Sequence, residues 1–310
     1  MSKTLNQKPS HEGIIKPGEL IEIRQAASLS LYDRRVLNLL IEHAGSTIAD
    51  DEVHHIAMSR LRPRKDNASE RVRDSIVRLM TTLVEVPVRD RNGKRATLRT
   101  AILASTTTTD DEQDPAGEVA FRFSQEMRTI IQKSDHWGRI KGYVMFAFNT
   151  KYALALYEAI CLRINLRISE QVFSVEDFRQ LLGVEKGRLS AFPQLKQRAL
   201  TPALEEVNAL SDFTVDIEPI REGGRIRGKL TGFRLSWERK DPEEWMETLD
   251  ELMRHSSGRK ARIRNQVEEI QPDTPERIPD DTGPVYERIP GDTLGSINER
   301  RAKLRAKQTR

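Results

Sequence analysis

The chain has 310 residues, of which 37% are hydrophobic and 32% charged, and this length suits roughly two globular domains. No run of about 18 apolar residues occurs, and the polar first segment lacks the apolar core of a secretory signal, so neither a membrane span nor a signal peptide is expected. The single cysteine, Cys161, excludes an intrachain disulfide and a cysteine-based zinc finger. We therefore expect a cytoplasmic protein.

The charges nearly balance, with 51 basic and 47 acidic residues and a net charge of +4. Arginine is nevertheless clustered, as in residues 60–65 and 89–91. Local clusters, more than net charge, determine phosphate binding. The same clusters also suit a solvated surface held by salt bridges, so charge alone leaves both interpretations open.

The first third of the chain predicts three helices and a hairpin. Residues 1–19 lack periodicity and predict a flexible N-terminal arm, and residues 20–24 alternate weakly, as in an edge strand. A helix is expected from Ser30, a suitable N-cap, to Gly45, followed by a short helix over residues 50–58 and a longer one over 67–83. Two β-prone segments, residues 84–88 and 96–104, flank an Asn-Gly turn and predict a hairpin. A polar loop (106–117), a strand (118–123) and a helix (124–133) follow.

A second cycle of elements begins near residue 150. Thr150 can cap a helix, Ser174 starts a short helix that ends at Leu182, and a long helix covers residues 190–210 with a kink near Pro202. Strands are expected at residues 213–219 and 226–237, joined by a Gly-Gly turn.

The order helix, short helix, helix, hairpin thus occurs twice, and it is the order of a winged helix. We predict an α+β fold of two tandem winged-helix domains. The first, residues 20–140, is expected to serve dimerisation and DNA contact, and the second, residues 141–255, to be the main DNA-binding domain.

The C-terminal part differs in composition. Residues 243–255 predict one more amphipathic helix, whereas residues 256–310, with many prolines and mixed charges, predict a disordered tail. Two similar heptads occur there, at residues 276–282 and 287–293. They are either a neutral duplication in a linker or a bivalent peptide for a protein partner.

Enzyme signatures are scarce. The sequence has no P-loop and no Gly-x-Ser-x-Gly elbow, and the adjacent His54 and His55 would point about 100° apart on a helix, too far apart to share a metal easily. A rolling-circle nickase would need a His-hydrophobic-His strand with a tyrosine nucleophile, and no His-x-His occurs. We predict no catalytic residue, no metal and no cofactor, and keep a DNA-nicking enzyme as an alternative.

The main functional signal is that each cycle combines a basic or polar helix face with a basic hairpin. In the second cycle an apolar face that includes Leu195 and Ala199 leaves glutamine and arginine side chains on the other side, where they suit adenine and guanine edges in a major groove. The predicted DNA-contact residues of the first domain are Arg71, Arg78, Arg91 and Lys94. Those of the second are Lys186, Arg188, Gln194, Lys196, Gln197, Arg198, Arg225 and Arg227.

Residues 192–208, FPQLKQRALTPALEEVN, resemble the C-terminal domain of iteron-binding, theta-type plasmid replication initiators. The shared pattern is an aromatic residue, Leu-Lys, a Leu-x-Pro-Ala step and Glu-hydrophobic-Asn, and Asp212, Gly224-Arg225 and Phe233 also fit it. The resemblance is specific over about residues 148–237, weaker over 20–135, and does not extend to the tail.

This resemblance implies two winged-helix domains that bind directly repeated origin sequences, or iterons, in double-stranded DNA. It also implies monomers that open the origin, and homodimers, formed largely through the first domain, that repress their own promoter. The expected protein partners are the host replication initiator and the replicative helicase. The alternative is a winged-helix transcriptional repressor without a role in initiation. Direct repeats beside an AT-rich region would favour initiation, and a lone inverted repeat at a promoter would favour repression.

Overall fold

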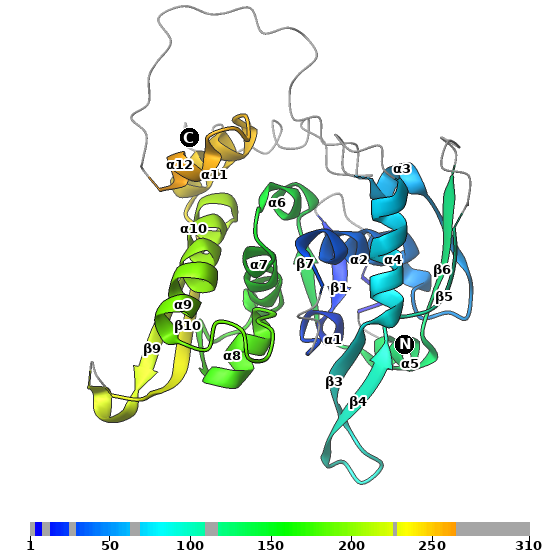
Figure 1. Cartoon of the computed structure of the whole chain (residues 1–310), viewed down its shortest axis with the longest axis horizontal. Helices are drawn as coiled ribbons and strands as arrows, with labels where there is room; N and C mark the ends of the chain where they lie inside the picture. The colour runs from blue at the N-terminus through cyan, green and yellow to red at the C-terminus, as the bar shows by residue number, and fades with distance from the viewer. Residues whose placement is uncertain are drawn as a thin grey trace, which may run out of the picture.

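The computed structural model describes residues 4–7, 13–24, 29–62, 69–108, 117–225 and 228–264. Figure 1 shows two units side by side, each with a long helix and a projecting hairpin. The first unit contains β1 (Ile14–Pro17), α1 (Gly18–Ile21), α2 (Leu31–Ala44), β2 (His54–Ala57), α3 (Met58–Leu61), α4 (Ser69–Thr81), β3 (Leu83–Arg89), β4 (Arg95–Ala101), β5 (Leu103–Thr108), β6 (Glu118–Phe123), α5 (Gln125–Lys133) and β7 (Trp137–Ile140). Helix α6 (Gly142–Ala147) leads into the second unit.

The second unit has the helix, strand, helix, helix, hairpin order of a winged helix. Its elements are α7 (Lys151–Arg163), β8 (Glu170–Ser174), α8 (Val175–Leu181), α9 (Phe192–Leu195), a π-helical turn (Lys196–Leu200), α10 (Thr201–Leu210), β9 (Phe213–Arg221) and β10 (Leu230–Arg239). Helices α11 (Pro242–Met253) and α12 (Arg259–Ile263) complete the described chain. No helix of the described residues is long and apolar enough to cross a bilayer.

Helices α2 and α4 form the centre of the first unit. Ser30 accepts a hydrogen bond from the Asp33 amide while the Asp33 carboxylate accepts one from the Ser30 amide, a capping box that fixes the start of α2 as predicted. Val72, Ile76 and Leu79 recur at helical spacing along α4 and are buried. This packing directs α4 toward the β3–β4 hairpin that follows it directly.

The β9–β10 hairpin belongs to a three-stranded sheet, and the β3–β4 hairpin forms a two-stranded sheet of its own. In the second unit the order is β8-β10-β9, so β10 is central and the β9–β10 hairpin extends beyond β8. In the first unit β2, β6 and β5 form one sheet, and β3 and β4 pair separately from Leu83 opposite Ala101 to Arg89 opposite Arg95. Gly93, with φ of 75°, makes the hairpin turn that the Asn-Gly sequence predicts.

The long helix predicted over residues 190–210 is present but contains the π-helical turn just before Pro202. Proline has no amide hydrogen, so the carbonyl of Arg198 cannot receive the usual i to i+4 bond from residue 202. The amide of Thr201 instead donates to the carbonyl of Lys196, five residues earlier. The kink that the sequence predicts is therefore one turn of wider helix.

Several short elements differ from the sequence predictions. Residues 14–17 of the predicted N-terminal arm form β1, which pairs with β7. Of the strand predicted at 20–24, the first two residues belong to the four-residue helix α1, and Arg24 makes an isolated β-bridge with Glu85. Both elements are too short to show a hydrophobic period. The helix predicted at 50–58 is wrong: residues 54–57 form strand β2, and α3 begins at Met58. In β2, His54 and Ile56 are buried and His55 and Ala57 exposed, an alternation of period two.

The remaining differences concern strands. The single strand predicted at 96–104 is divided into β4 and β5, and β5 continues into the predicted loop as far as Thr108. Strand β8 lies in a segment for which the sequence predicted no element. The predicted strand at 118–123 is confirmed as β6, and the following helix as α5.

The tail was predicted to begin at residue 256, but residues 259–263 form α12, whose Arg259 is buried. A five-residue helix shows no readable period, and the basic composition of this segment suggested solvent exposure. Residues 265–310 of the predicted tail, including both heptads, lie outside the described residues.

The two units share a polar contact that is buried. Lys16 of β1 forms an ion pair of 2.9 Å with Glu158 of α7, and both side chains are at most 3% exposed. Asn38 of α2 donates to the other oxygen of Glu158 at 2.7 Å. Three elements distant in sequence therefore meet at one carboxylate, which ties α7 to the first unit.

Candidate nucleic-acid interface

The exposed face of the helix formed by α9, the π turn and α10 carries the polar residues that the sequence selected. Leu195, Ala199 and Ala203 are buried along one side. Gln194, Lys196, Gln197 and Arg198 are all exposed. This is the arrangement a recognition helix needs, with an apolar side on its domain and hydrogen-bonding side chains toward solvent.

Arg179 of α8 fixes the backbone of the turn that precedes this helix. Its guanidinium donates to the carbonyl of Leu189 at 2.8 Å and to that of Arg188. Lys186 and Arg188 remain exposed, and Arg188 lies 3.5 Å from Glu185. The turn thus presents two cations at the start of the recognition helix from a backbone that is fixed in place.

The β9–β10 hairpin is coupled to the same end of the recognition helix. Arg221 lies 5.1 Å from the centre of the Phe192 ring and donates to the carbonyl of Gly228 at 2.9 Å. Arg225 is exposed at the hairpin tip, and Arg227 lies outside the described residues. The sequence alone does not indicate a role for Arg221, because its contact with Phe192 spans 29 residues and no local pattern predicts that contact.

In the first unit, the two arginines selected on α4 differ in their surroundings. Arg71 is exposed and lies 4.6 Å from the centre of the Tyr32 ring. Arg78 donates three hydrogen bonds of 2.9–3.1 Å to the buried carboxylate of Asp33. Ser75, on the same helix, is buried and also donates to Asp33.

The hydrogen bonds at Asp33 shift the pKa of both Asp33 and Arg78. Burial would raise the pKa of Asp33, but the hydrogen bonds from Arg78, Ser75 and Ser30 outweigh it and lower that pKa. The hydrogen bonds to Asp33 also raise the pKa of Arg78. The guanidinium of Arg78 therefore holds α4 against the start of α2, whereas that of Arg71 faces solvent over an aromatic ring.

The β3–β4 hairpin presents Arg91 and Lys94 at its exposed tip. The carboxylate of Asp90 accepts from the amides of Asn92 and Lys94, each at 2.8 Å, so the tip is ordered by its own side chain. In Figure 1 this hairpin and the β9–β10 hairpin project at the same end of the molecule. The selected residues thus form two groups, one in each unit, with a basic hairpin in each.

Among the described residues, no group of three or more His, Cys, Asp or Glu side chains could hold a metal ion. Tyr157 is buried, and burial raises its pKa well above the usual value. Its ring stacks on Phe213 at 5.5 Å, and its hydroxyl accepts from the amide of Lys141. Tyr157 is therefore a side chain of the core.

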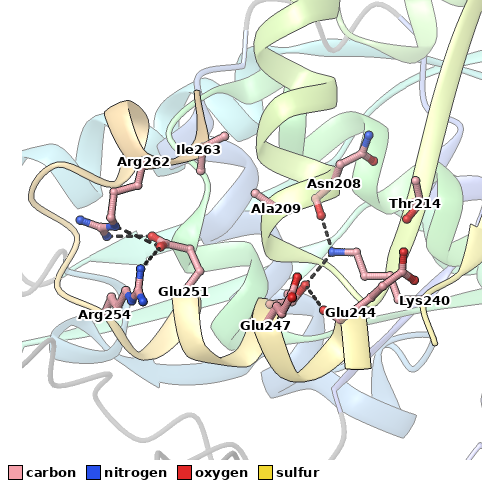
Figure 2. Close-up of a pocket in the computed structure, with 11 residues that line it drawn as sticks. Asn208, Ala209, Thr214, Lys240, Glu244, Glu247, Glu251, Arg254, Arg262 and Ile263 are labelled. Carbon is pink, nitrogen blue, oxygen red and sulfur yellow. Dashed lines mark hydrogen bonds and ion pairs between the residues drawn. The ribbon is translucent and has the colours of Figure 1, made fainter. Parts of the chain in front are cut away.

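Lys240, directly after β10, lines a pocket together with residues of β9, α10, α11 and α12 (Figure 2). Its ammonium donates to the hydroxyl of Thr248 at 2.6 Å and to the carbonyl of Asn208. Burial lowers the pKa of Lys240 to about 8, although Glu244, Asp212 and Glu247 oppose the shift. Lys240 thus joins the end of the recognition helix to α11.

Two family models match the chain. The model of the initiator replication protein WH1 domain matches residues 13–161, and that of the initiator Rep protein WH2 domain matches residues 174–237. The WH1 match runs past residue 140, where the sequence analysis divided the domains, and includes most of α7. No curated protein matches the chain. Since the two matches together cover well over half of the residues, the chain belongs to the initiator Rep family of plasmid replication initiators, with two winged-helix domains in tandem.

Proposed function

We propose that this initiator binds iterons in double-stranded DNA and opens the plasmid origin without catalysing a covalent step. The observation that carries the proposal is the repeated pairing of a helix bearing exposed basic side chains with a basic hairpin, and both hairpins project at one end of the molecule (Figure 1). Two such units on one chain suit contact with successive grooves on one side of a duplex.

In the second domain, Gln194, Gln197 and Arg198 read base edges in the major groove. Glutamine pairs with adenine and arginine with guanine, each contributing about 1–3 kcal/mol of discrimination. Lys186 and Arg188, at the turn before the helix, and Arg225, on the hairpin, contact phosphates on either side. Arg227, which lies outside the described residues, is assigned the same role from the sequence alone.

In the first domain, Arg71, Arg91 and Lys94 contact DNA from the helix and the hairpin tip. Arg78 supports α4 through Asp33, whose carboxylate compensates its charge, and contacts DNA with the exposed part of its side chain. The first domain also forms the homodimer that represses the initiator's own promoter. Monomers open the origin, and the host replication initiator and replicative helicase then join them.

Opening of the origin draws on binding energy. Bending a site of 20–30 base pairs costs on the order of 1–6 kcal/mol, which occupancy of several repeated sites can supply beside an AT-rich segment. No nucleotide hydrolysis is needed.

The test uses the full chain and supercoiled plasmid carrying its own origin, with Mg²⁺ and no nucleotide. We expect footprints on direct repeats and permanganate-reactive thymines in the adjacent AT-rich segment. Protection of only a lone inverted repeat at the promoter, without reactive thymines, would instead indicate a repressor. Relaxed plasmid or a covalent protein–DNA product would indicate a nickase.

A further inference from the structure

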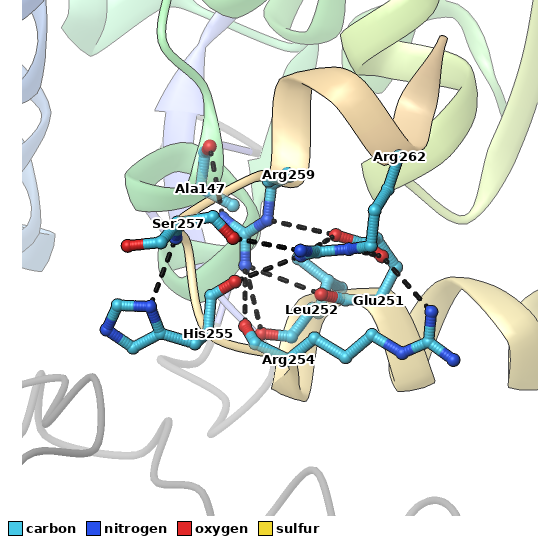
Figure 3. A network of polar contacts seen from close by, with 8 residues as sticks. All are labelled: Ala147, Glu251, Leu252, Arg254, His255, Ser257, Arg259 and Arg262. Carbon is cyan, nitrogen blue, oxygen red and sulfur yellow. Dashed lines mark hydrogen bonds and ion pairs between the residues drawn. The ribbon is translucent and has the colours of Figure 1, made fainter. Parts of the chain in front are cut away.

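Helices α11 and α12 lie beyond residue 237, where the WH2 match ends, and they are locked to each other around Glu251. Figure 3 shows Arg254, Arg259 and Arg262 converging on this residue. Arg262 makes bonds of 2.7 and 3.0 Å to the two carboxylate oxygens, and Arg259 lies 3.4 Å from one of them. We call α11, α12 and the intervening turn, residues 242–264, the C-terminal clasp.

Arg259 fixes the clasp to the body of the protein. It is 4% exposed, and its guanidinium donates to the carbonyls of Leu252 and Arg254 at the end of α11, each at 3.3 Å. It also donates to the carbonyl of Ala147 at the end of α6, at 3.5 Å. A buried cation at the carboxyl ends of two helices gives α12 a defined position on the second domain.

This position brings α12 to the recognition helix. Arg264, directly after α12, bonds to Glu205 of α10 at 2.7 Å. Lys260, which is exposed, lies close enough to Glu206 to lower its pKa in part, although burial raises that pKa overall. The clasp therefore places one cation by each member of an adjacent acidic pair on the recognition helix.

The acidic pair is a problem for a DNA-binding helix, because carboxylates repel phosphates. Along the helix, Glu205 lies one turn beyond Thr201 and two turns beyond Gln197. These three residues line one open groove, which is completed by Pro193, Lys196 and Arg264. Without the clasp, this end of the groove would be acidic. With it, two cations, Lys196 and Arg264, line the groove together with Glu205.

We propose that α12 is a third DNA-contacting element of the second domain, in which Arg264 binds a backbone phosphate beside the recognition helix while neutralising Glu205. The occupant of the groove is the phosphodiester backbone of duplex DNA, since the groove joins residues already assigned to DNA contact with a cation from outside the WH2 segment. This inference rests on the proposed DNA-binding function.

The test measures affinity of the full chain for origin DNA and for random duplex over a range of salt concentrations. A protein that loses one phosphate contact releases about one counterion fewer, so Arg264→Gln should reduce the magnitude of the salt slope by about 1. It should weaken binding several-fold on both DNAs. Arg264→Lys should keep the slope, and Glu205→Gln should keep the slope and bind at least as well as wild type.

Arg254→Gln is the matched control, because Arg254 belongs to the same clasp and faces Glu251 at 3.9 Å but does not line the groove. It should leave the slope unchanged. If Arg264→Gln and Glu205→Gln weaken binding equally with wild-type slopes, the pair only supports the fold and the inference is wrong. If Arg264→Gln binds both DNAs with the affinity and salt slope of wild type, the inference is also wrong. If wild type itself fails to bind origin DNA, the proposed function fails, which is a separate outcome.

Discussion

Arg198 lies within the π-helical turn of the recognition helix, on its exposed side, as does Lys196. We expect Arg198→Ala to weaken binding to the specific site by about 1–3 kcal/mol and to relax preference at one base pair. Binding to random duplex of equal length should change little. Competition assays with single-base variants of the repeat check this, and an equal loss on random DNA would make Arg198 a phosphate contact.

Lys240 predicts a dependence of stability on pH. The folded protein releases the Lys240 proton near pH 8, whereas the unfolded chain holds it up to the ordinary value of 10.5. Because the unfolded state binds more protons between these values, a rise in pH through this window stabilises the fold. The penalty for burying the charged amine is fully present below pH 8.

We therefore expect the free energy of unfolding of wild type, relative to Lys240→Gln, to increase between pH 7.5 and 9.5. Urea titrations of both proteins at the two pH values measure it. The comparison with the variant cancels the titration of other groups, such as the buried Cys161. A difference that stays constant would show that Lys240 titrates normally.

Among the elements, those with long periodic patterns or strong caps could be predicted from the sequence, and short ones could not. Helix α2 has its Ser30 cap, and α7 its Thr150 cap, and both begin where the sequence placed them. Strand β1, helix α1 and helix α12 have only four or five residues. Their positions depend on partners that are distant in the sequence, such as β7 for β1. A local sequence pattern does not indicate such partners.

In the candidate interface too, features with a local periodic pattern could be predicted and contacts between distant residues could not. The exposed face of the recognition helix could be predicted, since Leu195 and Ala199 give the buried side a period. The role of Arg78 could not, because its bond to Asp33 spans 45 residues. The same holds for Arg264, which reaches Glu205 across 59 residues from a segment that composition assigned to a tail.

The tip of the β3–β4 hairpin can be tested as one element. We expect the double variant Arg91→Gln, Lys94→Gln to reduce the magnitude of the salt slope by about 2 and to weaken binding to specific and random DNA alike. Salt-dependent binding isotherms measure the slope. Arg234→Gln serves as a control, because Arg234 is exposed between Glu170 and Glu218 on the sheet of the other domain. Unchanged slopes in the double variant would remove this hairpin from the DNA interface.

At the scale of the whole molecule, the buried Lys16–Glu158 pair joins β1 to α7, the helix in which the WH1 match ends and with which the second unit begins. Burial lowers the pKa of Lys16, against the opposing effect of Glu158. Removing one partner leaves the other charge uncompensated, so Lys16→Met should destabilise the fold by about 3–5 kcal/mol. The double variant Lys16→Met, Glu158→Met should recover much of that loss. Urea denaturation of the four proteins in the cycle measures the coupling, and additive losses would mean that the pair does not act as a unit.

The same ion pair also bears on the time course of synthesis. Lys16 and Glu158 are 142 residues apart, so strand β1 cannot reach its final partners until about half of the chain has been made. At about 5–20 residues per second, the segment waits roughly 7 to 30 seconds after it is translated. During that interval the first domain is incomplete on the ribosome, with one edge of its core still open. A newly made initiator is thus exposed to proteases and chaperones for longer than the size of either domain suggests.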